Sequence, residues 1–210
     1  MADMSDSRST TSIVIAPSSL TPSSRLRLLA AVAIVGVLSG VAAWLLKGAL
    51  ALLPQWLTHM ADALGSRWFM LPMPLVGVLL AAVLSRYVLR MNLEHGTAQI
   101  RNHLVDKQWR LSPRIILGSL LGNALTLGFG GSAGSESPMA YTGSSVAASV
   151  ARWLRLTESQ ALMLIGIGGG AGIAAIFKSP IGGALFTIEV LGMTMPMFGL
   201  LLLFASTLIA

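Results

Sequence analysis

The chain has 210 residues, of which 54% are hydrophobic and only 10% are Asp, Glu, Lys or Arg. Soluble domains carry charge on about a quarter of their residues, so the composition indicates an integral membrane protein. The formal net charge is +6, but the basic residues stand at the ends of apolar runs, where they fix membrane orientation, and nucleic acid is not an expected partner. Cys is absent, and His59, His95 and His103 lie outside the long apolar runs, so we expect no metal site, no cofactor and no His-based or Cys-based catalysis.

The N-terminal residues 1–24 are rich in Ser and Thr and contain two prolines, which predicts a disordered tail. Arg25 and Arg27 follow this tail, and Arg86 and Arg90 follow the second apolar run. Basic residues favour the cytoplasmic side of a membrane. We therefore expect the tail to be cytoplasmic and the protein to reside in the plasma (inner) membrane.

Two long apolar runs open the part of the chain that we expect to lie in the membrane, residues 25–210. The first, residues 28–46, is uncharged and long enough to span, since about 20 residues are needed. It resumes after Lys47, which predicts one long, tilted helix that ends near Pro54 and Trp56. The second run covers residues 69–85.

The rest of the chain alternates short apolar segments with Gly, Pro or charged residues. Residues 94–114 are the most polar of these and predict a short surface helix or a re-entrant element. Further helices are expected over 115–127, 136–156, 159–177, 180–190 and 197–210. Broken helices of this kind are typical of transporters and channels whose half-helices point at a mid-membrane ion site. The expected fold class is therefore an all-α polytopic membrane protein with broken and re-entrant helices.

One carboxylate, Glu136, stands alone between two uncharged runs, residues 115–135 and 137–151, and Pro138 suits the first turn of a helix beginning there. A helix N-terminus binds anions through its N–H groups and partial positive charge, and a carboxylate beside it can compete for those donors. Burying a carboxylate in a membrane costs roughly 2.5–3.5 kcal/mol or more, whereas complementing a helix dipole returns only about 0.3–1 kcal/mol. Because the cost of burial exceeds the gain from the helix dipole, we expect Glu136 to belong to an ion site.

Two glycine-rich stretches flank the predicted helix. Gly128 to Gly134 is expected to shape the loop of the ion site, and Gly166 to Gly172 to permit close helix packing. A second carboxylate, Glu189, lies near a helix end, where it could either serve function or reach the membrane interface.

Two motifs resemble the CLC family of chloride channels and proton–chloride exchangers. Gly134-Ser-Glu-Ser-Pro138 resembles the family's G-[K/R]-E-G-P motif, whose Glu is the gating carboxylate at a half-helix N-terminus. The stretch from Gly172 to Val190, GIAAIFKSPIGGALFTIEV, is similar to the family's G-x-A-A-x-F-x-[A/S]-P-[L/I]-x-G-x-L-F-x-[I/L]-E segment. The resemblance covers about residues 25–210 and implies the first half of a CLC-type inverted repeat.

Several positions depart from the family pattern. Ser135 and Ser137 replace the basic residue and the second Gly of the first motif, and the expected G-S-G-I-P motif near residue 95 reads EHGTA. Val190 stands where exchangers carry a proton-handling Glu, as in channel-type members. Only the first half of a family subunit is matched, and Ala210 falls within an apolar run, so we expect a chain cut short.

The resemblance implies passage of chloride or a similar anion through a pathway gated by Glu136, with no enzymatic activity. Expected anion-binding residues surround Glu136 and the third motif; they are Gly134, Ser135, Ser137, Met139, Ala140, His95 and Gly96, with Glu189 as a secondary acidic site. Expected partners are the anion, protons if transport is coupled, the lipid bilayer and, at full length, a second copy of the subunit. Two alternatives stay open: a proton-coupled chloride exchanger, and a non-transporting half-protein that is a remnant or a membrane interaction partner.

Overall fold

The structure, a computed structural model, describes residues 13–14, 22–65, 67–88 and 97–210. Its helices are α1 (Pro22–Ala63), α2 (Met73–Val83), α3 (Thr97–Val105), α4 (Arg114–Gly128), α5 (Glu136–Trp153), α6 (Glu158–Phe177), α7 (Pro180–Glu189) and α8 (Met197–Ile209). A 3-10 turn at Arg67–Met70 precedes α2, and a π-helical turn at Leu84–Val88 extends it. The prediction of an all-α fold with broken helices is confirmed.

One short pairing was not expected. Strand β1 (Ile13–Val14) pairs in parallel with β2 (Met193–Thr194), the stretch between α7 and α8. The predicted disordered tail over residues 1–24 otherwise falls almost wholly outside the described residues, up to the start of α1 at Pro22.

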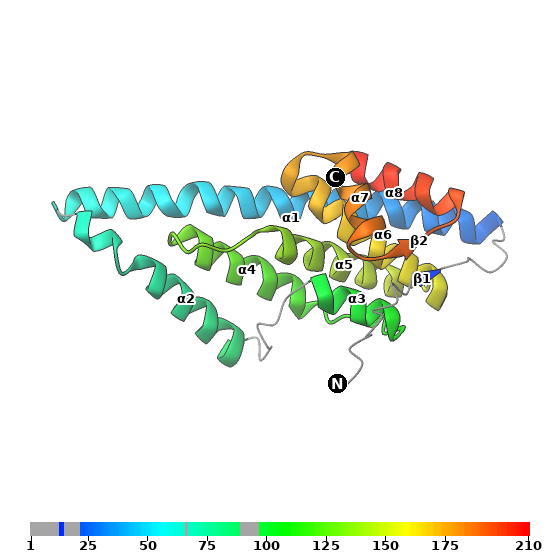
Figure 1. Cartoon of the computed structure of the whole chain (residues 1–210), viewed down its shortest axis with the longest axis horizontal. Coiled ribbons are helices and arrows are strands. Elements are labelled where there is room, and N and C mark those ends of the chain that lie inside the picture. Colours follow the sequence, from blue (N-terminus) through cyan, green and yellow to red (C-terminus); the bar gives the residue numbers. More distant parts are fainter. Residues whose placement is uncertain (1–12, 15–21, 66, 89–96) are drawn as a thin grey trace, which may run out of the picture.

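The first helix, α1, is a rod of 42 residues, which is about 63 Å at 1.5 Å per residue, and α4 to α8 lie along it (Figure 1). The prediction that the helix continues through Lys47 is confirmed, but the expected end near Pro54 was wrong. Pro54 lies inside the helix, although proline removes one backbone hydrogen bond and crowds the preceding turn. The adjacent Leu53 packs directly against Gly128 at the end of α4, and this contact supports α1 at its weakest point.

Helix α6 forms the centre of the fold. Every residue from Gln160 to Ile176 is buried, because α1, α5, α7 and α8 pack around α6. Its N-terminus carries a capping box in which Thr157 and Gln160 satisfy each other's backbone N–H groups. Its C-terminus ends at Lys178 in the left-handed conformation, with φ of 55°.

Glycines set the distance between α6 and its neighbours. A Cβ atom on Gly168 would meet the backbone of Gly143 in α5, and one on Gly170 would meet Gly183 in α7. Two hydroxyls bond across the same contacts: Ser144 Oγ donates to the carbonyl of Ile165 at 3.1 Å and Thr187 Oγ1 to that of Gly166 at 3.2 Å. The prediction that the glycines of α6 permit close packing is confirmed.

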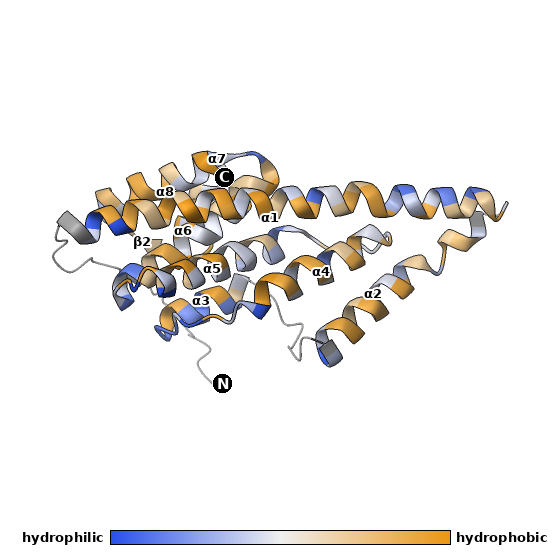
Figure 2. Cartoon of the chain, turned by 180° about the vertical axis from the view of Figure 1, so that it is seen from behind, coloured by the Kyte–Doolittle hydropathy of each residue, from blue (hydrophilic) through white to orange (hydrophobic). Residues whose placement is uncertain are grey.

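Polar and apolar residues segregate along the molecule. Figure 2 shows hydrophilic residues over the start of α1, helix α3 and the turn between α5 and α6, and further ones along the far part of α1, while much of α2, α4 and α8 is hydrophobic. Within the described part of the chain, three helical stretches are long and apolar enough to cross a membrane: residues 24–63, 68–87 and 158–177. The protein is an integral membrane protein.

The antiparallel packing of α5 on α6 fixes the start of α5. The carbonyl of Met139 lies against Gly172, near the C-terminal end of α6. Met139 also belongs to a small apolar cluster with Leu46 of α1, Ala124 of α4 and Ala175 of α6. The first turn of α5 is therefore surrounded by α1, α4 and α6.

Candidate functional site

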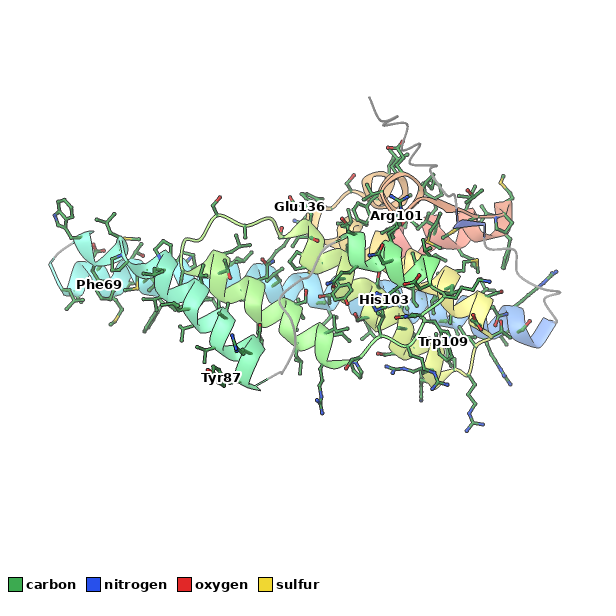
Figure 3. All side chains as sticks on the ribbon, turned by 60° about the horizontal axis from the view of Figure 1, so that its bottom comes forward. Phe69, Tyr87, Arg101, His103, Trp109 and Glu136 are labelled. Atoms are coloured by element: carbon green, nitrogen blue, oxygen red, sulfur yellow. The ribbon has the colours of Figure 1, made fainter. Side chains whose placement is uncertain are left out.

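The loop from α4 leads directly into the carboxylate singled out in the sequence. The last turn of α4 is closed by two backbone hydrogen bonds, from Gly130 N to Leu127 O at 3.0 Å and from Gly131 N to Thr126 O at 2.8 Å. Gly130 has φ of +87°, a conformation that side chains disfavour. The chain then reaches α5, whose first residue is Glu136 (Figure 3).

The Glu136 side chain folds back over the loop rather than along its helix. Its Oε2 atom contacts the position that a Cβ atom on Gly134 would occupy, so the carboxylate lies over the start of α5. The side chain is exposed in this structure, and the expectation that the membrane buries it stays a prediction. The carboxylate is therefore accessible beside the first turn of α5.

The N-terminus of α5 is not capped by its own side chains. Ser135 is the N-cap residue and its side chain makes no cap hydrogen bond. Pro138 has no N–H group, and Met139 N donates to Ser135 O at 3.1 Å. The N–H groups of the first helical residues have no acceptor within the helix itself, so this end of α5 suits an anion.

A second helix begins beside the first turn of α5. The backbone N–H of Thr97, the first residue of α3, donates to Ser137 Oγ at 3.1 Å. Ser137 is one of the departures from the CLC motif, and the structure uses its hydroxyl to join two helix N-termini. Thr97 directly follows His95 and Gly96, which lie outside the described residues, so their assignment to the site stays a prediction.

A cavity of about 240 Å³ lies between α4 and the start of α5. From α4 it is lined by residues that share one face of the helix; these are Gly118, Ser119, Gly122, Asn123 and Thr126. From the loop and α5 it is lined by Ala133, Gly134, Ser137 and Pro138. The lining is uncharged and mostly apolar, with a few polar side chains. Ser119 Oγ donates across it to Pro138 O at 2.9 Å, which ties α4 to the first turn of α5.

The remaining predicted residues contribute differently. Met139 and Ala140 are fully buried in the core, so their side chains do not face an anion. Glu189 is exposed at the end of α7, near the level of Gly166, to which Thr187 bonds. The start of α5 lies at the level of Gly172 of α6. This position is about 9 Å further along α6 than Gly166, at 1.5 Å per residue, and α5 and α7 pack on different sides of α6. The structure does not bring Glu189 to the site.

Sequence reasoning missed Asn123 and Ser119. Both lie in the run 115–127, which it treated simply as a hydrophobic helix, although a lone Asn in such a run was a visible signal. Among the described residues, no group of three or more His, Cys, Asp or Glu side chains comes together as metal ligands.

A sequence model of the family described as "Voltage gated chloride channel" matches residues 77–210. Chloride channel protein clh-3 of Caenorhabditis elegans is 32% identical over 123 residues, covering 54% of this chain and 12% of that protein. Chloride channel protein CLC-d of Arabidopsis thaliana is 30% identical over 109 residues, covering 45% of this chain and 14% of that protein. The aligned regions thus span a small part of these relatives.

Solved structures match over most of the chain. A slow cyanobacterial Cl⁻/H⁺ antiporter has a TM-score of 0.69 and 28% identity, covering 91% of this chain and 47% of that one. A CLC-type fluoride/proton antiporter, at 24% identity and the same TM-score of 0.69, covers 91% of this chain and 48% of that one, and shows the shared fold. The chain spans about half the length of these structures. Because the family model matches well over half of its residues, the chain belongs to the voltage-gated chloride channel (CLC) family, a family of channels and transporters and not of enzymes.

Proposed function

We propose that the protein passes chloride or a similar small anion across a membrane, through a pathway gated by Glu136. The observation that carries this proposal is the α5 N-terminus, where an accessible carboxylate folds back over Gly134 and a helix end without a side-chain cap lies beneath it. Family membership supports anion transport, and the geometry supports the role of this carboxylate.

The gating step follows from competition at one helix end. The ionised carboxylate and an anion both favour the partial positive charge and N–H groups of that end. When Glu136 is ionised and folded back it blocks the approach of an anion, and when it is protonated or displaced the anion takes its place. Gly134 and the backbone at Ser135 and Ser137 lie next to this position. The approach of α3 to Ser137 supports a contribution from the segment that contains His95 and Gly96.

The whole pathway needs more than this part of the fold. The chain spans about half of the solved structures that it matches, and we propose that the second half of the fold supplies the other wall of the pathway. We also propose that the full-length subunit forms a homodimer in the bilayer, as the family resemblance implies.

Proton-coupled exchange is the second candidate function. The similarity to a cyanobacterial Cl⁻/H⁺ antiporter favours it, whereas Val190, at the end of α7, stands where the resemblance places a proton-handling Glu in exchangers. A chloride gradient imposed across liposomes that contain the full-length protein distinguishes the two. Proton movement driven by that gradient, followed with a pH-sensitive dye, identifies an exchanger, and its absence during chloride flux identifies a channel.

The gate is tested by substituting Glu136→Gln and measuring chloride efflux from liposomes across a range of pH. Gln has the shape of a protonated Glu and cannot ionise, so we expect efflux to lose most of its pH dependence. Glu158→Gln is the matched control, because Glu158 is likewise an exposed carboxylate at the first residue of a helix. Unchanged efflux and pH dependence in Glu136→Gln would refute the gate. Absence of efflux from the wild-type protein would favour the non-transporting alternative.

We propose that one end of the molecule faces the cytoplasm, namely the end formed by the start of α1, helix α3 and the turn between α5 and α6 (Figure 2). Basic residues gather there, with Arg27 near the start of α1, Arg152 in the last turn of α5 and Arg155 after it, in agreement with the positive-inside rule. Because the chain has no Cys, single cysteines placed at Ser24 and at Gly65 can report the orientation. Labelling of a cysteine at the Ser24 position from outside the cell would show that the orientation is opposite to the one proposed.

A further inference from the structure

The cavity beside α4 contains an unused hydrogen-bond donor. Asn123 is only 6% exposed, and its Nδ2 atom has no hydrogen-bond partner within the described part of the chain. Buried amide groups in proteins are nearly always bonded, and an unpaired one is unfavourable in a membrane protein. Asn123 is one of the residues that line the cavity reaching Gly134 and the first turn of α5. Its position indicates that the cavity holds an acceptor.

The other polar side chains of α4 in the cavity are already committed. Ser119 Oγ donates to Pro138 O at 2.9 Å, and Thr126 Oγ1 donates to Gly122 O at 2.9 Å. The Asn123 amide is therefore the α4 side-chain donor left for a guest. Neither hydroxyl needs to move for that guest to bind.

The chemistry of the lining favours an anion over a cation. The lining residues include no carboxylate and no imidazole, which a bound metal ion would require. The atom without a partner is an N–H donor rather than an oxygen, and the N-terminus of α5, an 18-residue helix, adds partial positive charge at the opposite wall. The volume of about 240 Å³ exceeds the roughly 30 Å³ that one water occupies. An anion can therefore enter with part of its hydration shell.

We propose that this cavity is a binding subsite for a small monovalent anion of halide type, with Asn123 Nδ2 as its side-chain donor. The subsite lies on the α4 side of Glu136, whose carboxylate contacts Gly134 at the rim of the cavity. It thus gives an anion a place next to the gate while the carboxylate still covers the start of α5. The proposal rests on the proposed function, because the anion that fills the subsite is the one that the pathway carries.

The direct test is anomalous diffraction from crystals of the full-length protein grown in bromide. We expect a bromide peak in the cavity within hydrogen-bonding distance of Asn123 Nδ2. A cavity without bromide, in crystals that show bromide elsewhere on the protein, would mean that water satisfies the amide, and the proposal would be overturned. This measurement needs no substitution and does not depend on how a variant folds.

Substitutions give the second test, with halide binding to the purified protein measured by calorimetry. Asn123→Leu keeps the branched shape of the side chain and removes the donor, and a hydrogen bond to a charged group is worth at least about tenfold in affinity. Asn123→Asp replaces the donor with a negative charge, so we expect weaker binding still. Ser39→Ala is the control, because Ser39 is also fully buried with an unpartnered polar atom but lies on α1, away from the cavity. Equal affinities in all four proteins would overturn the subsite.

The outcomes separate this proposal from the proposed function. Efflux that responds to Glu136→Gln, together with wild-type halide affinity in Asn123→Leu, would leave the gate in place and remove the subsite. A bromide peak at Asn123 in a protein without any efflux would keep the subsite and remove the proposed transport function.

Discussion

Two glycine-rich stretches of similar composition differ in what their glycines do. In α6, Gly168 and Gly170 lie in regular helix, and each faces the backbone of a neighbouring helix. Between α4 and α5, Gly130 supplies a positive φ and Gly134 leaves room for the Glu136 carboxylate. The first stretch brings helices together and the second shapes a loop next to the exposed Glu136 side chain. Small residues alone therefore do not reveal which of the two roles a glycine has; what it contacts decides.

The stretches are not entirely distinct. Gly128, in the loop-forming set, is the last residue of α4 and packs against Leu53 of α1. It therefore serves helix packing, although we expected it to shape the site. Only the glycines after it, where the helix has ended, serve the loop.

The largest effect is expected from filling a helix contact. Gly168→Ala places a methyl group against the backbone of Gly143, which has no flexible end to move aside, and overpacking of this kind typically destabilises by about 1–3 kcal/mol. Gly48→Ala is the matched control, because Gly48 lies inside α1 and a methyl group there would have no neighbouring atom within 4 Å. There, alanine's helix propensity should stabilise by up to about 1 kcal/mol. Thermal unfolding in detergent should show a lower unfolding temperature for Gly168→Ala and a higher one for Gly48→Ala. Equal shifts of the two unfolding temperatures would contradict the contact between Gly168 and Gly143.

A smaller effect is expected where only backbone conformation matters. A methyl group at Gly130 has space, since the nearest atom, in Pro74, is 3.6 Å away, but φ of +87° is unfavourable for alanine by about 1–2 kcal/mol. Asn tolerates left-handed backbone better than alanine does, so Gly130→Asn should recover part of the loss. Unfolding midpoints of the two variants test this order. Alanine equal to or better than Asn would show that the loop can change its conformation.

The sequence predicted helices more accurately than contacts. Charged residues, Gly and Pro interrupt the apolar runs sharply, so α4 to α8 begin and end within about three residues of the expected positions. The far end of α1 was missed because the helix continues through Pro54 beside the contact of Leu53 with Gly128 of α4, and that contact depends on tertiary structure. The start of α5 at Glu136 followed from the local pattern of a lone carboxylate before a helix. The cavity beside it did not, because the environment of Asn123 depends on which face of α4 meets the loop.

The smallest effect on stability, and the most informative for the gate, is expected at Gly134. A methyl group there meets Glu136 Oε2, the end of a flexible side chain that can swing away, so Gly134→Ala should change the free energy of unfolding by less than about 0.5 kcal/mol. The displaced carboxylate should instead alter chloride efflux, by roughly twofold or more if the two residues couple as neighbours usually do. In a Glu136→Ala background no carboxylate remains to be displaced, and the second substitution should have no effect on efflux. An effect of Gly134→Ala that persists in that background would place the action of Gly134 in the loop itself, because contact with the carboxylate could no longer account for it.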